Sequence, residues 1–244
     1  MNALQVKNLV KEFGGVRAVD GLSVDFERGK ITGVVGPNGS GKTTLTNLLT
    51  GMHAIDGGTV VVGGENEHGH IRSYEVFGLG ITRTFQNVRL FEQMTVLDNI
   101  LVVGTARSVW GSLFERHTAF HEHEARAVLE RVGLWEKRYA YANTLSYGQR
   151  KLLEIARALA TKADIILFDE PYAGLFPEMV KLVSDIMKEL RAGEKTIILI
   201  EHDMALIREL CDRVIVMDAG KLLAEGEPEA VLKDGKVIEA YLGV

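Results

Sequence analysis

The sequence contains a single cysteine, Cys211, among 244 residues. One cysteine excludes an intrachain disulfide framework and fits a reducing compartment. The chain also lacks a block of basic residues, and its formal net charge is −5. A direct nucleic-acid surface is therefore not favoured.

Long apolar runs are missing as well. Residues 165–168 and 197–200 are apolar runs of four residues each, far below the roughly 20 residues of a membrane-spanning helix. The first five residues lack the basic and apolar regions of a signal peptide. No internal repeat or low-complexity segment is present. We therefore expect a soluble protein, or one that is peripheral to a membrane through its partners.

A glycine-rich stretch between a short apolar run and a plausible helix is the most informative motif. It consists of Gly36, Pro37, Asn38, Gly39, Ser40, Gly41, Lys42, Thr43 and Thr44. The pattern Gly-x-x-x-x-Gly-Lys-Thr in a strand–loop–helix context predicts a phosphate-binding loop, against the alternative of a chance glycine-rich turn. Lys42 is expected to reach the β- and γ-phosphates, and Thr43 to supply a hydroxyl group to Mg²⁺.

Alternating residues and short apolar runs predict further strands, and helical spacing, caps and turn residues predict further helices. Strands are expected at 4–9, 22–26, 31–35, 59–62, 81–85, 165–168, 196–200 and 213–217, with a turn at 11–15. Helices are expected at 45–50, 119–132, 145–160, 177–191, 203–210, 228–233 and 236–242. Strands that alternate with helices indicate an α/β protein with a mainly parallel sheet. We expect residues 1–90 and 162–244 to form a nucleotide-binding core with an antiparallel β lobe, and 91–161 an inserted helical lobe.

Three polar residues follow two of the expected buried strands. Asp169 ends one strand, where an acid can hold Mg²⁺ next to the phosphate loop. Glu170 follows at once as a candidate general base for water. His202 ends the neighbouring strand, at the edge where ligands bind in such sheets. A lone histidine is more often a surface or core residue, so its assignment depends on this placement.

Residues 145–149 open a helix with an unusual sequence. Ser146 and Gln149 have the spacing of a capping box. That explanation leaves out Gly148, which is a poor residue for a first helical turn. An anion that approaches this helix end would need a small residue there, with Ser146 and the exposed amides as donors.

Taken together, these motifs resemble the ATP-binding cassette family of P-loop ATPases across nearly the whole chain. Residues 36–43 resemble its Walker A loop, Leu-Ser-Tyr-Gly-Gln its signature motif, and Asp169-Glu170 the end of its Walker B strand. Gln86 takes the Q-loop position, and His202 the switch position. The resemblance implies ATP and Mg²⁺ as ligands, with Gln86 among the metal contacts.

The same resemblance implies a dimer. In that family two cassettes enclose two ATP molecules head to tail, so Ser146, Gly148 and Gln149 would face the nucleotide of a second cassette, identical or related. Phe13 matches the aromatic residue that stacks on adenine. Phe176 departs from the family pattern, which usually has aspartate there, and puts the coupling between the two sites in doubt. Tyr147 replaces the usual glycine of the signature.

Two further features indicate which cassette this is. The 58 residues between Gln86 and Leu145 are too few for the coiled-coil arms of chromosome-structure ATPases. Residues 80–99 and 226–243 resemble the ATPase subunits of branched-chain amino-acid importers, although urea and amide importers share the pattern. The resemblance implies membrane permeases, which would dock near 87–99, a periplasmic binding protein, and a location on the inner face of the cell membrane. An export or lipid-extraction ATPase and a non-transport ATPase are the alternatives.

Several histidines lie close together in the sequence. The spacing of His117, His121 and His123 does not keep all three on one helical face, and no cysteine is near. We therefore expect a solvated helix there in preference to a metal site.

Overall fold

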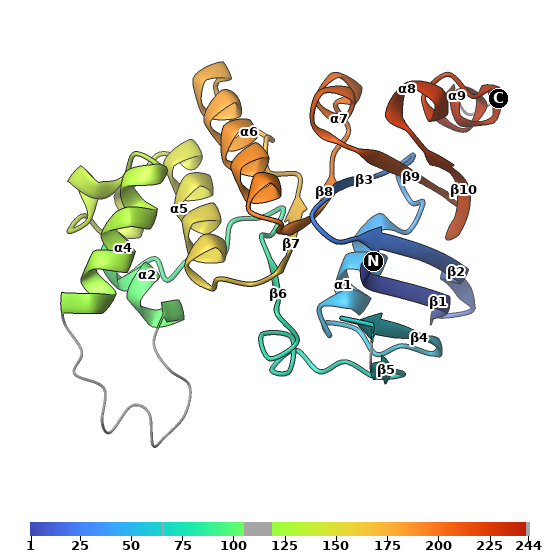
Figure 1. The fold of residues 1–244 in the computed structure, drawn as a ribbon, viewed down its shortest axis with the longest axis horizontal. Coiled ribbons are helices and arrows are strands. Elements are labelled where there is room, and N and C mark those ends of the chain that lie inside the picture. The colour runs from blue at the N-terminus through green and yellow to red at the C-terminus, as the bar shows by residue number, and fades with distance from the viewer. Residues whose placement is uncertain (65, 105–118, 243–244) are drawn as a thin grey trace. The chain divides into compact units, whose positions relative to one another are not determined.

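The computed structural model describes residues 1–64, 66–104 and 119–242 (Figure 1). The chain divides into two compact units. The core unit consists of Met1–Arg83, Asp164–Glu170 and Ser184–Val244, and the helical unit of Thr84–Ala163 and Pro171–Val183.

A six-stranded sheet forms the larger part of the core unit, with the strand order β10-β9-β3-β8-β7-β6 among the described residues. Its strands are β3 (Ile31–Val35), β6 (Ile81–Arg83), β7 (Ile165–Asp169), β8 (Thr196–Ile200), β9 (Arg213–Asp218) and β10 (Lys221–Gly226). All pairs are parallel except β9 and β10. Every residue of β3, β7 and β8 is buried, as in parallel strands that are covered on both faces. The carboxyl ends of these strands lie at one edge, where ligands of such sheets bind.

A second, antiparallel sheet belongs to the same unit, with the order β2-β1-β4-β5. Its strands are β1 (Asn2–Phe13), β2 (Val16–Glu27), β4 (Gly57–Val62) and β5 (Asn66–His68). Apolar residues alternate along β1 and β2, so that one face of each strand is buried. One hydrophobic core joins this sheet, the parallel sheet and helix α1 (Lys42–Leu49) through residues such as Phe26, Leu48 and Ile198.

Among the described residues, four further helices belong to the core unit in whole or in part. They are α7 (Met204–Leu210), α8 (Pro228–Val231), α9 (Gly235–Leu242) and the second half of α6 (Pro177–Ala192). The helical unit contains α2 (Val96–Gly104), α4 (Ala119–Arg131) and α5 (Tyr147–Ala160), which pack on one another, and the first half of α6. The structure thus confirms the α/β class, with a mainly parallel sheet, an antiparallel sheet and an inserted group of helices.

The helical unit covers 84–163 and 171–183, and so adds 84–90, 162–163 and 171–183 to the expected lobe of 91–161. Close approach explains the last addition. A Cβ atom at Gly148 would lie 2.6 Å from Met179 Sδ, and one at Gly174 would lie 2.8 Å from a ring carbon of Tyr147. The start of α5 therefore packs tightly against the segment that leads into α6.

Some expected elements differ from those observed. Residues 11–13 continue β1 instead of starting a turn, because they pair with β2, and only Gly14 and Gly15 turn, with φ of 54° and 86°. The strand expected at 81–85 ends at Arg83, since the Phe85 N–H group donates to Glu154. Strands β5 and β10 were not expected.

Candidate functional site

The loop between β3 and α1 has a backbone that only glycine can follow at two positions. Gly36 has φ of 149°, and a Cβ atom there would lie 2.1 Å from the Met217 carbonyl oxygen. Gly41 has φ of 101°, and a Cβ atom there would lie 2.3 Å from the Ala18 carbonyl oxygen. Gly41 is also the N-cap of α1 and provides no side-chain cap. The helix end thus has no side-chain cap for its amides, which is the arrangement that phosphate-binding loops use for an anion.

The side chain of Lys42 is folded into this loop. Its Nζ donates to the carbonyl oxygens of Gly36 (2.7 Å) and Pro37 (2.9 Å), and to Ser40 Oγ at 3.3 Å. Burial lowers the pKa of Lys42, and the negative charges of Glu170 and Asp169 oppose this effect. An ammonium group held by carbonyl oxygens can exchange them for phosphate oxygens with little movement of the backbone.

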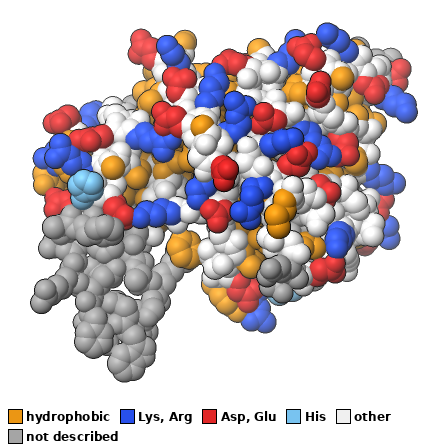
Figure 2. Space-filling model, viewed as in Figure 1, with side chains coloured by type: hydrophobic (Ala, Val, Ile, Leu, Met, Phe, Trp, Pro, Cys, Tyr) orange, Lys and Arg blue, Asp and Glu red, His pale blue; other side chains and the backbone are white. Residues whose placement is uncertain are grey.

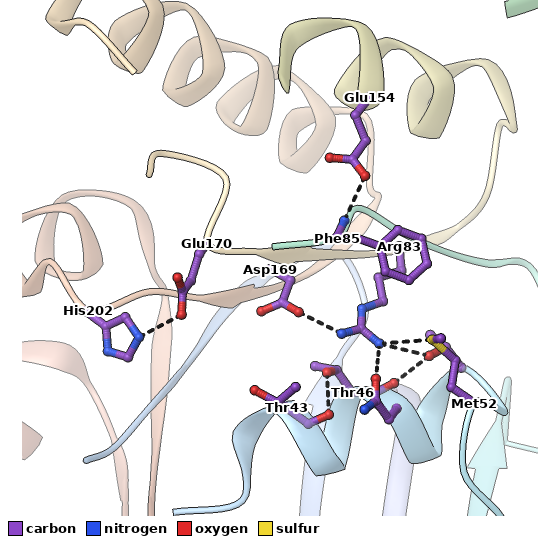
Figure 3. Close-up of polar contacts among 11 residues, drawn as sticks. Thr43, Thr46, Met52, Arg83, Phe85, Glu154, Asp169, Glu170 and His202 are labelled. Atoms are coloured by element: carbon purple, nitrogen blue, oxygen red, sulfur yellow. Dashed lines mark hydrogen bonds and ion pairs between the residues drawn. The ribbon is translucent and has the colours of Figure 1, made fainter. Parts of the chain in front are cut away.

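Asp169, the last residue of β7, forms a buried ion pair with Arg83 at the end of β6 (Figure 3). Arg83 Nη2 lies 2.7 Å from Asp169 Oδ2, and the side chains are 6% and 3% exposed. The other nitrogen, Nη1, donates to Asn47 Oδ1 (2.6 Å) and Thr50 Oγ1 (3.3 Å), both at the C-terminal end of α1. Arg83 therefore fixes the carboxylate of Asp169 against the helix that begins in the phosphate loop.

Arg83 is the site residue that the sequence analysis missed. Its partner Asp169 lies 86 positions later in the chain, so no local pattern pairs them. The available signal was a charged residue at the end of a short strand, three positions before Gln86.

Glu170 and His202 meet at the same edge of the sheet. His202 Nε2 lies 2.8 Å from Glu170 Oε1 (Figure 3). The Glu170 N–H group donates to the Ile200 carbonyl oxygen at 3.0 Å, which extends the pairing of β7 with β8. Glu170 has φ of 47°, a left-handed conformation that side chains other than glycine rarely adopt and that is concentrated at functional sites. The expected acid and the expected histidine thus form one hydrogen-bonded pair.

The residues expected to hold Mg²⁺ are a hydroxyl, a carboxylate and an amide. Thr43 at the start of α1 and Asp169 supply hard oxygen atoms from the core unit (Figure 3). Among the described residues no group of three or more histidine, cysteine, aspartate or glutamate side chains could hold a metal ion. A sparse oxygen set of this kind fits Mg²⁺, which is usually bound through one or two protein groups, substrate phosphates and water.

Phe13, at the end of β1, exposes its ring between two side chains. His53 packs edge-on against it, with the ring centroids 5.1 Å apart. Lys11 Nζ lies 5.2 Å from the Phe13 ring centroid. The ring is 43% exposed, so a face remains accessible for stacking on a planar base.

The remaining expected site residues belong to the helical unit. Ser146 is the N-cap of α5, and the capping box with Gln149 is present in both directions. The close contact of Gly148 with Met179 is a packing reason for this glycine that the sequence analysis did not foresee. Gln86 lies in the exposed segment that follows β6.

Phe176 precedes α6 and is 74% exposed. Its carbonyl oxygen accepts the N–H groups of Met179 (2.9 Å) and Val180 (3.0 Å), which makes it the N-cap residue of this helix. Tyr147, the other departure from the family pattern, is also exposed. Both aromatic residues therefore lie on the surface of the helical unit.

The histidine-rich segment is only partly visible. His117 and the side chain of His121 lie outside the described residues, and His123 lies in α4. Lys, Arg, Asp and Glu side chains are interspersed on the face in Figure 2, without a patch of one sign. In the part of the chain that the structure describes, no helix is long and apolar enough to cross a membrane.

The sequence matches two families of known proteins. Residues 19–173 match the family described as ABC transporter. Residues 221–244 match the family described as branched-chain amino acid ATP-binding cassette transporter. The chain is 40% identical to the high-affinity branched-chain amino acid transport ATP-binding protein LivG of Salmonella typhimurium, over 98% of this chain and 97% of the relative.

Solved structures of the same kind match over the full length. The crystal structure of a nucleotide-free ATP-binding cassette from an ABC transporter covers 100% of both chains, with a TM-score of 0.87 and 35% identity. The ADP conformation of an ATP-binding cassette of an ABC transporter also covers 100% of both, with a TM-score of 0.84 and 36% identity. Fold and sequence thus agree on one class of protein.

Proposed function

Because the chain belongs to the ABC transporter family, we propose that it is the ATP-hydrolysing subunit of an importer for branched-chain amino acids. The observation that carries the cargo is the full-length similarity to LivG, together with the match of residues 221–244 to the branched-chain amino acid family. The observation that carries hydrolysis is the Glu170–His202 pair beside a phosphate loop that holds Lys42.

The phosphate loop binds the nucleotide. The backbone amides of residues 36–44 and the N-terminus of α1 hold the phosphate oxygens. Lys42 Nζ leaves the carbonyl oxygens of Gly36 and Pro37 for the β- and γ-phosphates. Adenine stacks on the Phe13 ring. The edge contact with His53 supports this ring.

Thr43, Asp169 and Gln86 would hold Mg²⁺. When bound, the metal would offset negative charge on the phosphate oxygens. Asp169 is oriented for this task through Arg83, which binds one of its carboxylate oxygens.

Hydrolysis uses the two residues at the ends of β7 and β8. Glu170 accepts a proton from the water that attacks the γ-phosphate, as a general base. His202 orients Glu170 through its Nε2 and contacts the γ-phosphate when the nucleotide is bound. The left-handed backbone of Glu170 breaks the extended conformation of β7, so its carboxylate does not continue the side-chain alternation of the strand.

The active form is a dimer with a second cassette, identical or related. Ser146, Gly148 and Gln149 at the start of α5 contact the γ-phosphate that the other cassette binds, since a capped helix start still offers backbone amides to an anion. A single subunit should therefore bind ATP but hydrolyse it poorly.

Two membrane permeases and a periplasmic binding protein complete the importer. The segment after Gln86 exposes Phe91 and Met94, which suit a contact with a permease helix. The subunit then sits on the cytoplasmic face of the membrane through these permeases.

Uptake measurements test the cargo. The chain is expressed together with the permeases and binding protein of a branched-chain amino-acid importer in a bacterium that lacks its own leucine, isoleucine and valine importers. We expect labelled leucine to accumulate with the wild type and not with Lys42→Ala. Accumulation of urea or short amides without leucine would mean that these solutes are the cargo. Outward movement of solute would favour an exporter.

A further inference from the structure

Glu154 is a buried acid on α5 that has no part in the mechanism above. It lies two turns after the capping box and is 4% exposed. Its Oε1 accepts the N–H group of Phe85 at 3.1 Å (Figure 3). The same oxygen accepts the N–H group of Arg89 at 3.3 Å. One carboxylate oxygen thus closes a loop of five residues, and Gln86 is inside it.

Burial of this carboxylate is costly, which argues against a purely incidental contact. Burial raises the pKa of Glu154, and the amides of Arg89 and Phe85 and the positive charges of Lys151 and Arg157 oppose this effect. Within the described residues, the second oxygen, Oε2, is buried without a hydrogen-bond partner. A buried acid of this kind is retained when the bonds that it makes fix something else.

Arg157, one turn further along α5, holds the same loop from its carbonyl side. Its Nη1 donates to the Arg89 carbonyl oxygen at 2.5 Å. Its guanidinium carbon also lies 4.9 Å from the Phe91 ring centroid. Asn99 of α2 binds the backbone of Phe91 through both its amide oxygen and its amide nitrogen, at 3.0 Å each.

We propose that Glu154 is the positioning residue for Gln86: its carboxylate gathers the amides of Phe85 and Arg89 and so fixes the backbone that carries the Gln86 side chain. This inference rests on the role proposed above for Gln86. Arg157 and Asn99 hold the far end of the segment, and Glu154 is the residue that closes the turn around Gln86 itself. The signature end of α5 and the Gln86 segment are thereby joined within one unit.

Glu154→Ala removes both bonds and takes the acceptor away from the amides of Phe85 and Arg89. Backbone amides over 85–89 should then exchange with solvent about tenfold faster or more, because charge-assisted bonds to a buried carboxylate protect them. Exchange over 152–158 of α5 should change little. Glu130→Gln is the matched control, since this exposed acid of the helical unit pairs with Arg126 on α4.

Turnover gives the second readout. In the assembled transporter, Glu154→Ala should lower kcat for ATP about tenfold, while KM for ATP changes less than about twofold, since the nucleotide is bound mainly by the phosphate loop. The Mg²⁺ concentration for half-maximal turnover should rise. Glu154→Gln retains one acceptor oxygen and should lose about threefold in kcat.

A double variant decides whether Glu154 acts through Gln86. In a Gln86→Ala background, Glu154→Ala should cause no further loss of kcat, because the two residues act as one unit. Multiplicative losses, or unchanged amide exchange over 85–89, would overturn the proposal. If Glu154→Ala does not fold, Glu154→Gln carries the same two readouts. If Gln86→Ala keeps full turnover, the role of Gln86 fails, while the exchange data still show whether Glu154 holds the loop.

Discussion

The buried ion pair between Arg83 and Asp169 should be a large contributor to the stability of the core unit. Arg83→Met removes the charge and keeps much of the length of the side chain. It leaves the Asp169 carboxylate, 3% exposed, without the partner that now lies 2.7 Å away. It also removes the bonds from Arg83 to Asn47 and Thr50.

The size of the effect follows from burial. Removing one partner of a buried pair costs about 3–5 kcal/mol, because the remaining charge stays desolvated and loses that opposite charge. For a chain of this length that loss corresponds to a fall in Tm of roughly 6–20 °C. Arg83→Lys keeps a charge but loses the forked contact, and should fall between the wild type and Arg83→Met.

Thermal unfolding followed by circular dichroism measures the loss. Arg17→Met serves as the matched control, since Arg17 pairs with Asp20 on the surface of the same unit, and exposed pairs contribute little. The double variant Arg83→Met/Asp169→Asn should be more stable than the sum of the single changes predicts, because it also removes the buried negative charge that Arg83 no longer balances. If Arg83→Met has the same Tm as Arg17→Met, the Arg83–Asp169 pair does not stabilise the site as described.

Two further substitutions test stability, one through its pH dependence and one through helix capping. Burial raises the pKa of the Cys211 thiol from 9.0 to about 12, so the folded state keeps a proton that the unfolded state loses. The stabilisation is complete below pH 9 and is lost as the pH rises from 9 towards 12. Relative to Cys211→Ala, the wild type should lose about 1.4 kcal/mol between pH 8 and pH 10, checked by urea unfolding at both values; parallel pH profiles would contradict this. Phe176→Asp places a capping carboxylate before α6 and should stabilise the protein by about 0.5–2 kcal/mol in the same assay, whereas a destabilised variant would mean that the exposed ring contributes packing within the subunit.

The phosphate loop and the strand ends could be predicted from the sequence because each is written in adjacent residues. Gly36 to Thr44 form one contiguous motif, and its glycines have backbone conformations that the pattern requires. Asp169 and His202 follow runs of buried apolar residues, and parallel strands bring such ends together. The meeting of Glu170 and His202 follows from the pairing of β7 with β8.

Contacts between distant side chains could not be predicted in this way. Arg83 and Asp169 are 86 positions apart, and Glu154 and Phe85 are 69 positions apart. Neither spacing has a periodic signature, so the ion pair and the loop closure appear only in the folded chain. The reason for Gly148 was likewise a contact with Met179, which lies on another helix.

Strand boundaries were predicted less well where burial is partial. Residues 221–226 alternate weakly and are at most half-buried, so β10 has no clear hydrophobic pattern and forms by pairing with β9. The end of β1 carries Lys11, Glu12 and Phe13, which are polar or exposed. Pairing with β2 holds these residues in the strand. Strand propensities of the individual residues do not predict this pairing.

The central claim is that Glu170, held by His202, is the general base for ATP hydrolysis. The phosphate loop, and not Glu170, binds the nucleotide. The most direct test is ATP turnover by Glu170→Gln, with ATP binding measured on the same preparation. We expect binding to persist and turnover to fall by about 10²–10⁴-fold, as for the loss of a general base, with the ATP-bound variant trapped as a dimer. Full turnover by Glu170→Gln would contradict the account.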